Sequence, residues 1–128
     1  MDDGTRNQVV EILEAASETV LESLRRAMPS VRLKCYHWRN PTIELMAFGT
    51  FSSGTEVVSL CVGVDAVGDG YHVVGDICHE DGRVVRDVVD CFADSEGMVV
   101  QVVREFCVEC ARHVEVIANA LRGGATTV

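Results

Sequence analysis

The residues of this sequence best suited to chemistry are cysteines and histidines that stand close together along the chain. The protein has 6 cysteines and 4 histidines, and the tightest group is Cys107-x-x-Cys110-x-x-His113. Zinc prefers thiolate sulfur and imidazole nitrogen, usually four ligands to an ion with two of them on a tight turn. Two shorter pairs, Cys35-x-His37 and Cys78-His79, could supply further ligands. This set is the candidate metal site of the sequence.

The spacing of Cys107, Cys110 and His113 also fits the buried face of a helix. The three fall inside a predicted helix rather than on a turn, and Cys110 and His113 lie near the centre of its apolar stripe. Cysteine is among the most buried residue types, and a second correctly spaced pair is missing. The pattern favours core side chains over a metal site, and we predict no cofactor.

A second arrangement that could do chemistry is Cys78 with His72 and Asp76. Alternation along a strand would place the three on one face, as a thiol, a base and a carboxylate that orients the base. Half-exposed strands produce such triplets by chance, and the sequence contains neither a Gly-x-Ser-x-Gly elbow nor a phosphate loop. We therefore predict a non-enzymatic protein and keep an enzyme of unknown class as an alternative.

Length and charge restrict the classes of protein to which this chain can belong. At 128 residues it can form one domain with its own core. A formal net charge of -9, from 20 acidic and 11 basic residues, repels phosphate backbones. This disfavours general nucleic-acid binding and is compatible with a basic protein partner. No apolar run reaches the length of a membrane span and no signal peptide is recognisable, so we expect a cytoplasmic protein with reduced thiols and no membrane partner.

Two one-sided amphipathic helices are predicted, over residues 6–28 and 96–121. Thr5 and Gln8 resemble a capping box at the start of the first helix, and Pro29 requires that helix to end. Glycines at positions 123 and 124 end the second helix.

Between the helices the hydrophobic period changes to two residues, which predicts β-strands. Gly-containing turns, of which Asp81-Gly82 is the strongest hairpin signal, join neighbouring strands in antiparallel order. Charges lie on both faces of the last strand, which is typical of an edge strand. The expected strands cover residues 31–38, 42–51, 56–65, 71–78 and 83–92.

This order predicts an α+β fold of the type α-β-β-β-β-β-α. It is a five-stranded antiparallel meander sheet with an N-terminal and a C-terminal helix packed on one face. Residues 1–4 are expected to be a disordered N-terminus, residues 5–122 a single α+β domain and residues 123–128 a flexible tail. Two helices with one apolar stripe each can cover only one face of such a sheet, so the other face is expected to be open to water or to a partner.

The open face is the predicted binding surface, because its side chains are of the types enriched at the centres of protein interfaces. Aromatic residues in particular provide most of the binding energy at such surfaces. The residues predicted to contact the partner are Arg32, Lys34, Tyr36, Trp38, Glu44, Met46 and Phe48.

In size, acidic charge and order of elements, the chain is similar to bacterial immunity proteins that neutralise toxins. Secretion chaperones have a similar profile, although they usually interrupt their sheet with a helix that is not predicted here. The resemblance implies a protein-binding domain, most concretely an immunity-protein-like inhibitor of a toxin or effector. The alternatives are a secretion-chaperone-like homodimer and a small-ligand or metal-binding domain that uses the cysteines and histidines.

Overall fold

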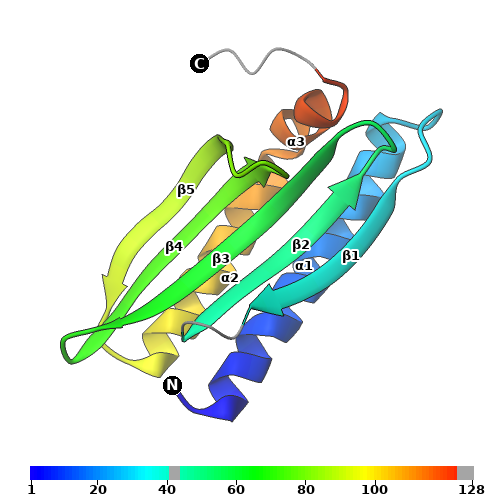
Figure 1. Ribbon diagram of the computed structural model, residues 1–128. Helices are drawn as coiled ribbons and strands as arrows, with labels where there is room; N and C mark the ends of the chain where they lie inside the picture. Colours follow the sequence, from blue (N-terminus) through cyan, green and yellow to red (C-terminus); the bar gives the residue numbers. More distant parts are fainter. Residues whose placement is uncertain (41–43, 124–128) are drawn as a thin grey trace.

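The protein folds into one antiparallel sheet that carries its helices on a single side (Figure 1). The structure is a computed structural model, and it describes residues 1–40 and 44–123. The predicted α+β class and strand order are confirmed, while the predicted strand start at residues 42–43 and the predicted tail from residue 124 lie outside the described residues. The elements are α1 (Asp3–Ala27), β1 (Lys34–Asn40), β2 (Leu45–Ser52), β3 (Val57–Val67), β4 (Gly70–His79), β5 (Val84–Ala93), α2 (Glu96–Arg112) and α3 (Val114–Leu121).

The sheet is a meander in which β1, β2, β3, β4 and β5 lie side by side in chain order, each antiparallel to the next. Paired residues point to the same face, and successive residues of a strand point to opposite faces. One face therefore collects the fully buried side chains of β2, β3 and β4 and packs against the helices. These side chains are Leu45, Ala47, Phe51, Val58, Leu60, Val62, Val64, Val73 and Ile77.

Helix α1 begins at Asp3, inside the segment predicted to be a disordered N-terminus. The side chain of Asp2 caps it by accepting a hydrogen bond from the backbone N–H of Thr5 at 3.0 Å. The amino group of Met1 pairs with Glu44 at 3.0 Å, which ties the chain end to the start of β2. The helix ends at Ala27, just before Pro29, as predicted.

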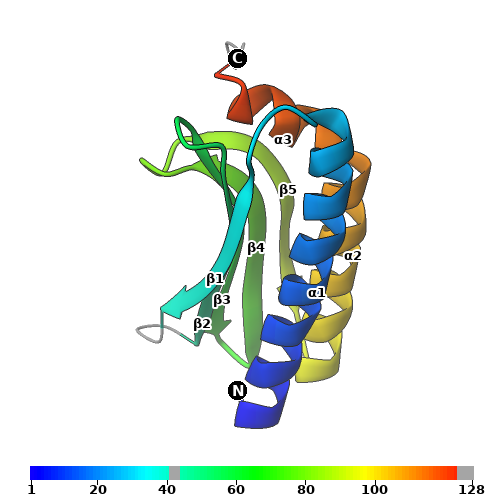
Figure 2. The same ribbon diagram turned by 90° about the vertical axis from the view of Figure 1, so that its right-hand side faces the viewer.

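The single helix predicted over residues 96–121 is wrong, because the chain turns at His113 and forms two helices. The backbone of His113 leaves the helical region at φ -109° and ψ 30°, although neither proline nor glycine stands there. Figure 2 shows α3 turned across one end of the sheet. The turn lets α3 bury Ile117 and Leu121, and the Leu121 carbonyl accepts a hydrogen bond from Ser53 Oγ at 3.2 Å. Burial of apolar surface against the sheet end outweighs the cost of interrupting the helix.

Strand β5 is the far edge of the sheet, as predicted, and its mixed pattern has a structural cause. Its pairing with β4 shifts register twice, between Gly75 and Asp76 and between Ile77 and Cys78. Each bulge adds a residue to one strand and so reverses which residues face the core. The first shift brings Asp87 to the face that carries Asp90, while Arg86 is paired with Ile77 on the helix side.

Two glycines permit the helices to approach the sheet closely. A Cβ on Gly49 of β2 would overlap the side chain of Ser17 on α1. A Cβ on Gly75 of β4 would lie 2.5 Å from the ring of Phe106 on α2, one of the largest fully buried side chains. Both positions require glycine, because the side chain from the helix occupies the space that a Cβ atom would need.

The opposite face of the sheet is not covered by any helix of the described chain. Figure 2 shows α1 and α2 side by side on one side of the sheet, with the strand ends curling away from them. No described helix is both long and apolar enough to cross a membrane.

The same glycine-to-alanine substitution is expected to change stability differently on the two faces of the sheet. Gly75→Ala should lower the free energy of unfolding by about 1–3 kcal/mol, because the methyl group must displace Phe106. Gly63→Ala should leave it unchanged or raise it slightly, because Gly63 faces the uncovered side, where the nearest atom to a Cβ is Met46 Cε at 3.9 Å. Urea unfolding measures both values, and equal destabilisation of the two variants would contradict this packing.

Candidate functional site

The uncovered face of the sheet is crossed by a row of five paired residues, one from each strand. Trp38 pairs with Phe48, Phe48 with Cys61, Cys61 with Asp76, and Asp76 with Asp87. The row is aromatic at the β1 edge and acidic at the β5 edge. The name "uncovered face" is used for the face of the sheet that contains this row and that no helix of the described chain covers.

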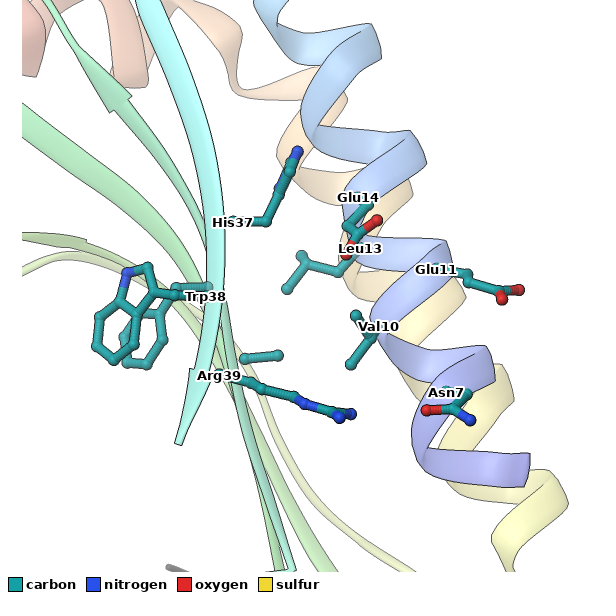
Figure 3. Close-up of a pocket in the computed structure, with 10 residues that line it drawn as sticks. Asn7, Val10, Glu11, Leu13, Glu14, His37, Trp38 and Arg39 are labelled. Atoms are coloured by element: carbon teal, nitrogen blue, oxygen red, sulfur yellow. The ribbon is translucent and has the colours of Figure 1, made fainter. Parts of the chain in front are cut away.

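At the aromatic end, the rings of Trp38 and Phe48 stack with centroids 3.8 Å apart and planes 6° from parallel. Tyr36 and Trp38 remain 47% and 49% exposed, although both are large and largely apolar. Figure 3 shows Trp38 on one side of β1 and His37 and Arg39 on the other, toward α1. The stacked pair is thus a rigid, half-exposed apolar platform that no element of the described chain covers.

Five of the seven residues predicted to contact a partner share this face. Trp38 and Phe48 are paired there, and Lys34, Tyr36 and Met46 occupy the same face by register. Arg32 is exposed but precedes β1.

Glu44 is engaged elsewhere. Its carboxylate accepts hydrogen bonds from the Met1 amino group at 3.0 Å and from Arg6 at 2.8 Å. The chain's amino group and Arg6 lower the pKa of this carboxyl, so its charge is already matched within the domain.

The centre of the uncovered face is polar and half-buried. The hydroxyls of Thr50 and Ser59 hydrogen-bond to each other at 2.8 Å and are buried. Beside them, Cys61 hydrogen-bonds to Cys78. This contact, together with burial and the nearby Asp76 carboxylate, raises the pKa of the Cys61 thiol. The same contact acts in the opposite direction on its partner, because the hydrogen bond from Cys61 lowers the pKa of the Cys78 thiol.

The acidic end places two carboxylates against each other. Asp76 and Asp87 are directly paired across β4 and β5. Burial, followed by the charge of Asp87, raises the pKa of Asp76. Like charges opposite each other destabilise a sheet, so this pair is unfavourable in the free protein. The sequence did not predict Asp87 on this face, because strict alternation along β5 places it on the face opposite Asp90, and the bulge between them reverses that placement.

The candidate catalytic triplet lies on this face but does not form a catalytic group. Cys78 and His72 are six residues apart on an extended strand, which places them about 20 Å from each other. His72 instead pairs with Asp90 at 2.6 Å, and Asp76 hydrogen-bonds to Cys78. A base and a nucleophile must lie within hydrogen-bond reach, so the thiol lacks this histidine as its base.

The candidate metal site in α2 is also not assembled. Cys107 and Cys110 are buried, and burial raises the pKa of Cys107 to about 11 and that of Cys110 further. His113, at the end of α2, lies 3.6 Å from Glu109. In the part of the chain that the structure describes, these three are not among the groups whose ligand atoms converge. All six cysteines are free thiols.

Comparisons with protein-family models, with curated proteins and with solved structures find no match to this chain. What the uncovered face offers is apolar surface at its β1 edge and negative charge at its β5 edge.

The raised pKa of Asp76 predicts how its removal changes stability with pH. A carboxyl whose pKa is higher in the folded than in the unfolded protein destabilises the fold above that pKa, and the penalty disappears as the pH falls below the unfolded value. Asp76→Asn should therefore raise Tm at pH 7 by roughly 2–4 °C, with a difference that vanishes at acidic pH. Asp65→Asn, an exposed carboxylate on the same face, is the control in a thermal-melt series. A constant difference at all pH values would contradict this reading.

Proposed function

We propose that this chain is a non-enzymatic protein-binding domain that holds a basic partner protein against its uncovered face. The observation that carries the proposal is the row of paired residues that runs from the stacked Trp38 and Phe48 to the opposed Asp76 and Asp87. One end of the row offers apolar surface, and the other end offers negative charge that nothing in the described chain neutralises.

The aromatic end supports an anchoring role. The stacking partner holds Trp38 in one orientation, so little side-chain entropy is lost when a partner covers it. Tryptophan and tyrosine are the residues most enriched among those whose truncation costs 2 kcal/mol or more of binding energy. A loss of about 2 kcal/mol corresponds to a roughly 30-fold weaker Kd.

The acidic end favours a basic partner over a second copy of the chain. Asp65, Asp76, Asp87 and Asp90 occupy the uncovered face by register, and Lys34 is the one lysine or arginine among the paired residues of that face. Two copies meeting through this face would bring eight carboxylates together, at a cost in Coulomb repulsion. An arginine or lysine from a partner would instead relieve the repulsion between Asp76 and Asp87.

The most concrete form of this proposal is an inhibitor that neutralises a toxin or effector. Proteins that act on nucleic acids carry basic surfaces, and an acidic domain with an aromatic anchor can occupy such a surface. A secretion-chaperone-like homodimer is the alternative.

The test compares capture of a partner by matched variants. Immobilised wild-type protein is expected to retain a basic protein from an extract of the cells that produce it, and binding should weaken with salt. Trp38→Ala and the double variant Asp76→Asn/Asp87→Asn should each weaken Kd by about 30-fold. Val108→Ala, which removes an exposed apolar side chain on the outer side of α2, is the control and should bind as wild type does.

Two results would overturn the proposal. If Trp38→Ala and the charge variant bind the partner with wild-type affinity, the uncovered face is not the interface. If light scattering after size-exclusion chromatography shows a dimer that Trp38→Ala dissociates, the occupant is a second copy and the homodimer alternative replaces the basic partner.

A further inference from the structure

We propose that Glu18, Cys35 and His37 form a binding site for a zinc-type divalent cation between α1 and the edge strand β1. The proposal is independent of the uncovered face, because Cys35 and His37 lie on the opposite side of β1.

The geometry is the first argument. Cys35 and His37 are two residues apart on β1, so both point toward α1, where Glu18 lies opposite them. One ligand atom from each residue lies within 4.8 Å of the other two. Two ligands of a tetrahedral zinc ion are about 3.3–3.6 Å apart, given metal–ligand bonds of about 2.0–2.3 Å. The distance from His37 Nε2 to Glu18 Oε1 is already 3.4 Å, so small rotations of half-exposed side chains complete the triangle.

The histidine supplies a second argument. Its Nδ1 is buried and has no hydrogen-bond partner in the described part of the chain. The contact of Nε2 with Glu18 is then the one polar interaction of the ring there. With Nε2 as the ligand atom, the ring proton stays on Nδ1, and the ring has no other hydrogen bond in the described chain that would hold Nε2 away from an ion.

The donor set selects the type of ion. A thiol sulfur, an imidazole nitrogen and a carboxylate oxygen suit zinc and its neighbours in the transition series. Calcium and magnesium bind almost entirely through oxygen, so the site is not suited to either.

The surroundings of the proposed site allow a further ligand at the fourth coordination position of the ion. The side chains of His37 and Glu18 are 26% and 61% exposed, so the site is reached from solvent. A pocket of about 420 Å³ between α1 and β1 adjoins the site at His37 and is lined by Glu14 and Arg39 among others, with Glu18 and Cys35 outside it (Figure 3). Glu14, one turn before Glu18, can supply a carboxylate or hold a bound water. Three protein ligands with an open fourth position are typical of zinc sites that bind a further ligand.

Arg25 and Arg39 are the cations that oppose binding at this place. Arg25 of α1 is close enough to act on Cys35, but it lies 3.6 Å from Glu22. Arg39 shares the pocket with Glu14 and Glu11. The carboxylate of Glu22 beside Arg25 reduces the repulsion of a bound ion by that arginine.

Titration of the purified, metal-free protein with Zn²⁺ alone, followed by calorimetry, is the first measurement. The expected result is one ion per chain, with Mg²⁺ giving no heat of binding. Cys35→Ser, His37→Gln and Glu18→Gln should each weaken Zn²⁺ binding at least about tenfold. The matched controls Cys91→Ser, His72→Gln and Glu105→Gln, the last an exposed carboxylate on α2, should leave it unchanged.

Co²⁺ provides a spectroscopic readout that identifies the sulfur ligand. A thiolate-to-cobalt absorption band is expected in the wild type and in Cys91→Ser, and its absence is expected in Cys35→Ser. Circular dichroism of each variant without metal establishes that the fold is kept. Failure to bind one Zn²⁺ per chain, or wild-type affinity in all three ligand variants, would overturn the proposed site.

Discussion

The structure depends on the fact that α1 and α2 can bury only one face of a five-stranded sheet. Their apolar sides meet the side chains of β2, β3 and β4 that point toward them, and Gly49 and Gly75 let the helix side chains approach the backbone. Because the strands alternate, every residue that faces the helices leaves its neighbours on the other face without cover. The exposed aromatic and acidic residues of the uncovered face are a direct result of this geometry.

The uncovered face is unfavourable for the isolated chain in two respects. It leaves half of the Tyr36 and Trp38 surfaces in water, and it opposes Asp76 to Asp87. Residues selected for stability alone would not be placed in this way, whereas residues selected for binding often lower the stability of the free protein. A partner that covers the rings and pairs with the carboxylates would remove both costs together.

Strand β1 connects the two proposed sites. Tyr36 and Trp38 lie on its uncovered side, and Cys35 and His37 lie on its helix side, so one strand carries both sets by alternation. As an edge strand, β1 is held by β2 on one side alone and by the contacts that its inner residues make with α1. A cation bound between Glu18 and β1 would hold this edge more firmly and, with it, the position of the aromatic anchor.

The sequence by itself determined the α+β class, the order of elements, the end of α1 before Pro29 and the face shared by Lys34, Tyr36 and Trp38. These features follow from local periodicity and from the backbone limits of proline, which act within a few residues. Only the tertiary structure decided the turn at His113, the bulges that bring Asp87 opposite Asp76, and the meeting of Glu18 with Cys35 and His37. The reason is physical: each of these depends on which distant surfaces pack together, and burial between elements outweighs the preferences of a short stretch of chain.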